Sequence, residues 1–179
     1  MLTALQKGLD FKQEDLLLMC DLLNQSGNPF FAARLMQQLL DTYYVDHTVE
    51  NLDRLFRFWY LSSEVEKAAK ALKASLKYDN GTKRYLDLAE LYYQQQDWKN
   101  MNLTIKEACT WTLKDPFVSR ANLLLGISEL KLNNEELAIK AFYNATMISG
   151  KVKEALAYLH YLNVDVSDIR RYEQITGVC

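Results

Sequence analysis

The stretch YLDLAELY, residues 85–92, decides the fold of this chain. Within it, Leu88, Ala89 and Tyr92 are spaced i, i+1 and i+4, which places them on one stripe of a helix. After a polar joint a second apolar stripe follows, at Trp98, Met101, Ile105 and Ala108. Two short amphipathic helices so close in sequence are expected to pack as an antiparallel hairpin.

The same pattern occurs four times along the chain with constant internal spacing. In every copy, 13 residues separate the key apolar residue of the first helix from its counterpart in the second: Met19 and Ala32, Leu55 and Ala68, Leu88 and Met101, Leu125 and Ala138. The next apolar residue comes four positions later, at Met36, Leu72, Ile105 and Phe142. Successive copies are 36, 33 and 37 residues apart. The units are therefore predicted to be alike inside and to differ in the joints between them.

Composition agrees with a helical repeat fold. The 179 residues include only 6 Gly and 2 Pro, too few for the many turns of a β-sandwich or barrel. We therefore predict an all-α fold, a right-handed α-solenoid of about four helix hairpins closed by a C-terminal capping helix. The expected units are 12–43, 48–79, 82–114 and 116–149, with the capping helix at 150–163, in a single domain 1–179. The first ten residues resemble the end of a helix whose partner is missing, so we expect a fragment of a longer chain.

Small residues are expected to allow close packing between the paired helices. Ala89 and Gly126 each follow the key apolar residue of a first helix. A side chain this small lets a neighbouring backbone approach closely. These positions are therefore predicted to lie at helix–helix contacts.

Charge and cysteine content exclude several classes of protein. The formal net charge is −2, and the basic residues are scattered among acids, so neither a nucleic-acid partner nor direct membrane insertion is expected. No apolar run approaches the ~20 residues of a spanning helix. Cys20 and Cys109 fall in apolar helical patterns and are expected to be small buried hydrophobes. Cys179 is expected to be a free thiol, and the three cysteines form no metal-binding spacing.

The sequence contains no constellation that indicates catalysis. Its two histidines, His47 and His160, lie in a polar joint and in the expected capping helix. Asp46 could orient His47, but no nucleophile is placed to use it. No glycine-rich phosphate loop and no zinc-protease motif occurs. We therefore predict no catalytic, metal-binding or cofactor-binding residues, and no cofactor.

The repeated pattern resembles the tetratricopeptide repeat (TPR). In that motif an apolar–small pair is followed by an aromatic residue, then by Ala, an aromatic or aliphatic residue, and Ala. The fourth unit matches best, through Leu125-Gly126, Ala138, Phe142 and Ala145. Departures are Glu129 in place of an aromatic residue, Met101 in place of Ala, and Gly150 or Asn80 where Pro is common. The resemblance covers roughly residues 12–150 and implies stacked helix hairpins.

A narrower resemblance concerns the cellular setting. The runs NPFFAA (28–33), ENL (50–52), YLDLAELY (85–92) and LLLGI (123–127) look like the C-terminal half of TPR proteins associated with TonB-type systems of Gram-negative bacteria. Those proteins are periplasmic and carry a signal peptide. The resemblance therefore implies a periplasmic protein whose signal peptide has been removed; otherwise the chain is expected to be cytoplasmic.

The resemblance to TPR proteins also implies a protein-binding groove. First helices of TPR hairpins line the concave side, so the positions two before, two after and five after each key apolar residue are expected to face inward. These positions are Asp53, Arg57, Tyr60, Leu86, Glu90, Tyr93, Leu123, Ile127 and Leu130, with Lys83 and Arg120 at the groove edge. The carboxylate clamp of chaperone-type repeats is not expected, because Leu86 and Glu90 take the places of its Lys and Asn. The alternative left open is that some of these side chains contact the neighbouring hairpin instead.

The sequence thus predicts a non-catalytic protein–protein interaction scaffold, in particular a periplasmic accessory to TonB-type energy transduction and iron uptake. Two alternatives remain open. One is a cytosolic adaptor or co-chaperone-like module, and the other is a regulatory repeat region of a larger enzyme. A homodimer formed by stacking of the first hairpin on its twin is a further expectation. The partner itself is not identifiable, because one repeat fold serves many functions.

Overall fold

The computed structural model describes residues 11–110, 115–147, 152–165 and 179. Every regular element in these ranges is an α-helix, as predicted. Clustering of contacts divides the chain into two compact units, Met1–Asp79 and Asn80–Cys179. The boundary falls in the Asp-Asn-Gly turn that separates the second and third copies of the repeat. The expectation for the first ten residues lies outside the described ranges.

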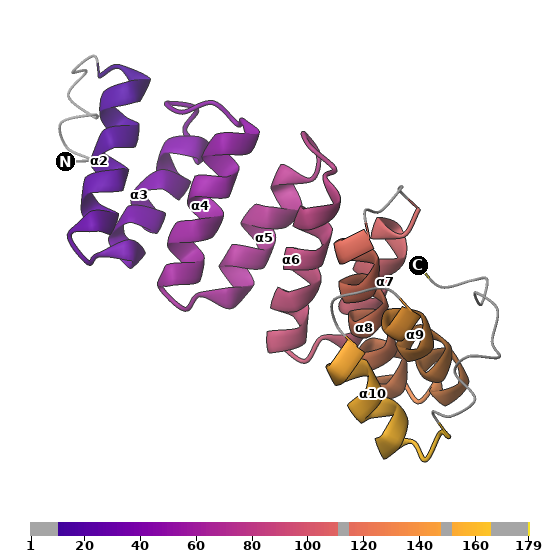
Figure 1. Ribbon diagram of the computed structural model, residues 1–179. Helices are drawn as coiled ribbons and strands as arrows, with labels where there is room; N and C mark the ends of the chain where they lie inside the picture. The colour runs from indigo at the N-terminus through magenta and orange to yellow at the C-terminus, as the bar shows by residue number, and fades with distance from the viewer. Residues whose placement is uncertain (1–10, 111–114, 148–151, 166–178) are drawn as a thin grey trace. The chain divides into compact units, whose positions relative to one another are not determined.

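In its described residues, 11–79, the N-terminal unit consists of two helix hairpins. Its helices are α2 (Gln13–Gln25), α3 (Pro29–Asp41), α4 (Val49–Leu61) and α5 (Val65–Ser75). Each helix packs against its neighbour in sequence (Figure 1). The joints between α2 and α3 and between α4 and α5 are three residues long, which leaves room for a tight turn alone.

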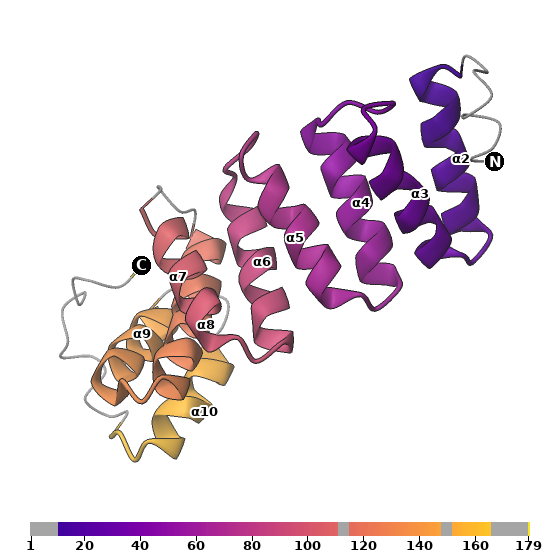
Figure 2. The same ribbon diagram turned by 180° about the vertical axis from the view of Figure 1, so that it is seen from behind.

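The part of the C-terminal unit that the structure describes contains two more hairpins and the expected capping helix. Its helices are α6 (Thr82–Gln94), α7 (Trp98–Ala108), α8 (Asp115–Lys131), α9 (Glu135–Met147) and α10 (Val152–Tyr161). Helix α8 contacts α6, α7, α9 and α10, as the view from behind in Figure 2 also shows. Helix α8 is therefore the central helix of this unit.

One turn geometry joins the two helices of every hairpin. Gly27, Ser63, Gln96 and Asn133 occupy equivalent positions and all have a positive φ, between 56° and 79°. In each turn the next residue donates its N–H to a carbonyl five positions earlier, as Glu64 does to Trp59 (3.0 Å). This Schellman-type ending satisfies carbonyls of the last helical turn and reverses the chain. The constant spacing of 13 residues follows from this shared turn.

The contact at Gly126 is made by a ring and not by a backbone. A Cβ atom placed on Gly126 of α8 would lie 2.5 Å from a ring carbon of Phe142 on α9. Phe142 is fully buried, and its other face stacks on Tyr158 of α10 at 4.7 Å between ring centroids. The prediction that Gly126 allows close packing is therefore correct in outcome, but the group that uses the space is an aromatic side chain.

Glu129 departs from the repeat pattern because a polar cluster surrounds it. It stands where the preceding copies have Trp59 and Tyr92, and it is 1% exposed. Its carboxylate accepts hydrogen bonds from Lys106 Nζ (2.7 Å) and Asn134 Nδ2 (2.8 Å). Burial raises the pKa of Glu129, but hydrogen bonds from Lys106, Asn102 and Asn134, together with the Lys106 charge, outweigh it and lower the pKa below its ordinary value.

The cysteines differ from expectation in one respect. Cys20 is buried and free, as predicted. Cys109 and Cys179, however, form a disulfide with Cα atoms 5.0 Å apart, which is within the usual range for a disulfide. Cys109 does pack half-buried against the core, as predicted in part, but it is bonded, and the prediction of a free Cys179 is wrong. Sequence spacing did not reveal the pair, because 70 residues separate the two cysteines.

Candidate functional site

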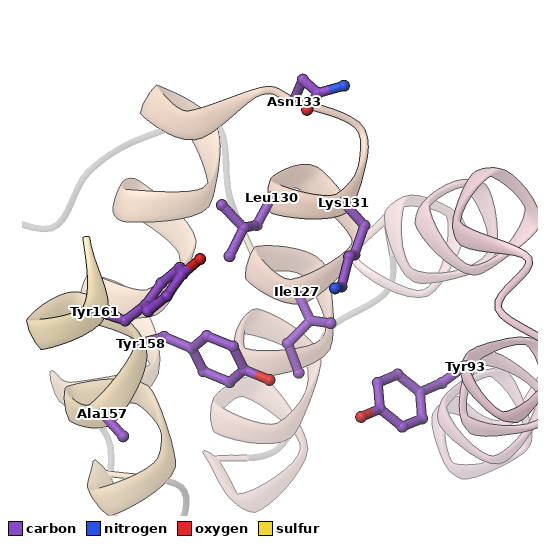
Figure 3. Close-up of a pocket in the computed structure, with 8 residues that line it drawn as sticks. All are labelled: Tyr93, Ile127, Leu130, Lys131, Asn133, Ala157, Tyr158 and Tyr161. Atoms are coloured by element: carbon purple, nitrogen blue, oxygen red, sulfur yellow. The ribbon is translucent and has the colours of Figure 1, made fainter.

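A cavity of about 690 Å³ lies in the C-terminal unit, between α6, α8 and α10 (Figure 3). We call it the tyrosine cavity. Three of the eight residues that line it are tyrosines, and none is acidic. The lining residues are Tyr93, Ile127, Leu130, Lys131, Asn133, Ala157, Tyr158 and Tyr161.

Packing against the core fixes two of the three tyrosine rings. Tyr93, in the last turn of α6, meets Trp98 edge to face with ring centroids 5.7 Å apart. Tyr158 is held by its stacking on Phe142. Tyr161, in contrast, is 75% exposed at the end of α10. The cavity therefore has two positioned aromatic walls and one ring at its rim.

The phenol groups of Tyr93 and Tyr158 are directed into the cavity from opposite sides (Figure 3). Burial raises the pKa of Tyr158, and the nearby Tyr93 raises it further. The Tyr158 hydroxyl therefore remains protonated near neutral pH. A phenol O–H can act as a hydrogen-bond donor.

Lys131 supplies the positive charge of the tyrosine cavity. Its ammonium lies 5.7 Å from the ring centroid of Trp98, a cation–π distance. Among the described ion pairs, Lys131 has no carboxylate partner within 4.0 Å. Two nearby acids are already paired, Glu129 with Lys106 and Glu90 with Arg120. Glu135, four residues after Lys131, forms no ion pair with it in the described part of the chain. The charge of Lys131 is therefore not neutralised by these acids.

A second polar feature connects α6 and α8. The Arg120 guanidinium bonds Glu90 (2.7 Å from Nε) and Asp87 (3.1 Å from NH2), and Asp87 also pairs with Lys83 at 2.6 Å. Burial lowers the pKa of Arg120, but hydrogen bonds and charges from Glu90 and Asp87 outweigh it and raise the pKa. The two cations and two anions balance, so this network mainly holds α6 against α8.

The structure brings several of the predicted groove residues together. Tyr93, Ile127 and Leu130 all line the tyrosine cavity. Lys83, Glu90 and Arg120 meet in the ion-pair network. Asp53, Arg57 and Tyr60 lie on α4 of the N-terminal unit, with Asp53 half-buried and Arg57 and Tyr60 exposed.

Two of the predicted groove residues are corrected by their burial. Leu86 is 0% exposed and Leu123 is 7% exposed, and neither lines the tyrosine cavity. Both belong to the core of the C-terminal unit, as does Ile127 (7% exposed), which in addition lines the tyrosine cavity. Leu86 and Leu123 contact neighbouring helices, which was the alternative left open. Packing of these two leucines against a neighbouring helix is favourable, because it removes their apolar surface from water.

Five lining residues were missed by sequence reasoning, because they come from the last residue of α8, the turn after it, and α10. They are Lys131, Asn133, Ala157, Tyr158 and Tyr161. A signal was present in the spacing of Tyr158 and Tyr161, since residues i and i+3 share a helix face. Their meeting with Tyr93 depends on how α10 packs on α8, which no local pattern specifies.

Comparison with known proteins supports the fold. No protein family matches the sequence, and no curated protein matches it. Among solved structures, MamA matches with a TM-score of 0.60 at 18% identity, covering 87% of this chain and 86% of MamA. A double mutant of MamA from RS-1 matches with a TM-score of 0.66 at 14% identity, covering 93% and 88%. PilF of Pseudomonas aeruginosa matches with a TM-score of 0.61 at 18% identity, covering 90% and 73%.

MamA and PilF are TPR proteins. The chain therefore has the fold of a TPR-type α-solenoid, the class that its repeated pattern predicted. At these identities the likeness concerns the fold, and the function is argued below from the site. In the described part of the chain, no helix has both the length and the apolar character needed to cross a bilayer.

Proposed function

We propose that the chain is a non-catalytic protein-binding scaffold that holds a segment of a partner protein in the tyrosine cavity. The observation that carries this proposal is the lining itself, with tyrosine walls on an aliphatic base of Ile127 and Leu130. Tyrosine is enriched at binding hot spots because it offers a large contact area with few rotatable bonds. The TPR-type fold supports the same conclusion, since stacked hairpins present extended binding surfaces.

Site-specific photocrosslinking tests this proposal directly. The photoreactive amino acid p-benzoylphenylalanine replaces Tyr161 at the cavity rim or, as a control, Tyr78, which is exposed in the N-terminal unit. In cells of the native organism, we expect the variant with the photoreactive residue in place of Tyr161 to capture a protein that the variant at Tyr78 does not capture. Mass spectrometry should place the crosslink in one short segment of that protein.

Binding of the purified partner segment then tests the role of the Tyr93 ring. Tyr93→Ala should weaken binding about 30-fold, the effect of losing one aromatic hot spot of roughly 2 kcal/mol. Tyr78→Ala should leave the affinity unchanged, and circular dichroism confirms that both variants are folded. Equal affinities for the two variants would exclude the tyrosine cavity as the binding site.

We propose further that this scaffold is a periplasmic accessory to TonB-type energy transduction and iron uptake. The support is the sequence resemblance together with the Cys109–Cys179 disulfide, since disulfides persist mainly in oxidising compartments. The expected crosslinked partner is an inner-membrane energy-transducing protein, and the parent protein should fractionate with the periplasm. Capture of a cytosolic chaperone or enzyme, with the parent protein in the cytosol, would favour the adaptor alternative.

A further inference from the structure

We propose that the tyrosine cavity selects partner segments in which an aromatic or long aliphatic residue stands next to an acidic residue, with Lys131 binding the acidic side chain. The inference rests on the proposed function, because it specifies the ligand of the same cavity. It follows from three features: an apolar interior, one cation without a carboxylate partner, and an open rim.

The interior requires an apolar anchor. Ile127 presents aliphatic surface between the rings of Tyr93 and Tyr158, and Leu130 adds to the aliphatic lining of the cavity (Figure 3). The volume of about 690 Å³ is large enough for a bulky side chain and part of its backbone. Tyr93 is 44% exposed, so covering its ring removes apolar surface from water and favours binding. A polar or small side chain of the partner would leave this apolar surface exposed to water.

The charge of the cavity requires an anion beside that anchor. Lys131 is the one cation among the described lining residues, and no acid stands among them. The Trp98 ring positions its ammonium without neutralising it. The phenol of Tyr93, which is directed into the cavity, adds a donor that a carboxylate can accept from. A basic partner segment would instead be repelled by Lys131.

The open rim favours an internal segment over a chain terminus. Lys131, Asn133 and Tyr161 are all exposed. An extended chain can therefore enter beside Asn133 and leave past Tyr161 without ending in the cavity. For this reason we assign the anion to an Asp or Glu side chain and not to a terminal carboxylate.

Selection from a library of short random peptides, displayed at the N-terminus of a phage coat protein so that they have no free C-terminus, tests the specificity. Peptides are selected on the full chain and remade in synthetic form with amidated ends. We expect enrichment of an aromatic residue, Leu or Met adjacent to Asp or Glu. Replacing the acid with its amide should weaken binding about two- to fivefold, the range for an exposed charge pair, and added salt should reduce the difference.

Variants of the chain identify the cation. Lys131→Met should abolish the preference for the acid, and Lys131→Glu should reverse it toward basic peptides. Lys153→Met, an exposed lysine of α10 outside the lining, is the matched control and should change nothing.

The outcomes separate the two proposals. If the selected peptides bind through Tyr93 but show no preference for an acidic residue, this inference is overturned and the proposed function stays intact. The same holds if the Lys131→Met variant keeps the preference for an acidic residue. A requirement for a free C-terminal carboxylate also overturns the inference. Absence of any peptide sensitive to Tyr93→Ala overturns the inference and also counts against the tyrosine cavity as the binding site.

Discussion

At the scale of single residues, Glu129 has a different role from the aromatic residue that the repeat pattern expects. An aromatic ring there would stabilise through buried apolar area. Glu129 instead stabilises through charge-assisted hydrogen bonds from Lys106 and Asn134, while Asn102 also bonds Ser128 at 2.9 Å. A buried carboxylate is tolerated only when its lone pairs are satisfied in this way.

Glu129→Gln should lower the free energy of unfolding by about 1–3 kcal/mol at neutral pH, the range for disrupting a buried charged hydrogen-bond network. The pKa of Glu129 is lowered in the folded state, so its stabilisation is complete above the ordinary value of 4.5 and is lost as the pH falls through the lower, folded pKa. The difference between wild type and variant should therefore shrink on acidification. Urea unfolding from neutral pH to below 4.5 measures this difference in the free energy of unfolding. A difference independent of pH would contradict the assignment. Glu135→Gln, at an exposed position of α9 without an ion pair among the described residues, serves as the control.

At the scale of elements, the hairpin turn and the ring contact behind Gly126 determine how the helices pair. The turn repeats because a positive φ at one residue closes each hairpin. The contact at Gly126 is specific to the α8–α9 hairpin, since the equivalent position in α6 is Ala89. It links the core to the tyrosine cavity, because Phe142 touches Gly126 on one side and Tyr158 on the other.

Gly126→Ala should destabilise the C-terminal unit by about 1–3 kcal/mol, the usual cost of overpacking a core. The added Cβ would lie 2.5 Å from the Phe142 ring, so the ring has to move. Phe142→Leu should relieve this clash, and a double-mutant cycle measured by thermal unfolding should give a favourable coupling energy between the two changes. Additive effects would indicate that the ring moves aside at no cost.

At the scale of the whole molecule, each compact unit is expected to be stable by its own core. The buried apolar cluster around Phe142 draws all its members from residues 86–179. We therefore expect a fragment of residues 80–179 to fold alone, with a helical circular dichroism spectrum and cooperative thermal unfolding. A fragment of residues 97–179, which lacks α6, should be markedly less stable because it loses Leu86 and Ala89 from that cluster. An unfolded 80–179 fragment would contradict the division into two units.

The disulfide predicts a specific count of thiols. In the native protein no cysteine should react rapidly, because Cys109 and Cys179 are bonded and burial raises the pKa of Cys20 to about 12. In denaturant without reductant one thiol per chain should be labelled, and with reductant three. Reduction should also lower the free energy of unfolding by about 2–4 kcal/mol, because the bond closes a long loop. Labelling of all three thiols in denaturant alone would show that the disulfide is absent, and Cys20→Ser is the control for the single label.

The sequence by itself determined the class of fold, the helix pairs and part of the site. Periodicity of 3.6 residues and a constant spacing within each unit are local properties, so they identified the hairpins. The resemblance to TPR proteins then implied that Tyr93, Ile127 and Leu130 belong to the groove. The tertiary structure alone decided that Leu86 and Leu123 are buried, that Cys109 meets Cys179, and that Tyr158 and Lys131 face one cavity with Tyr93. These outcomes depend on contacts between helices distant in sequence, whose packing angles and neighbours are not encoded in any single helical pattern.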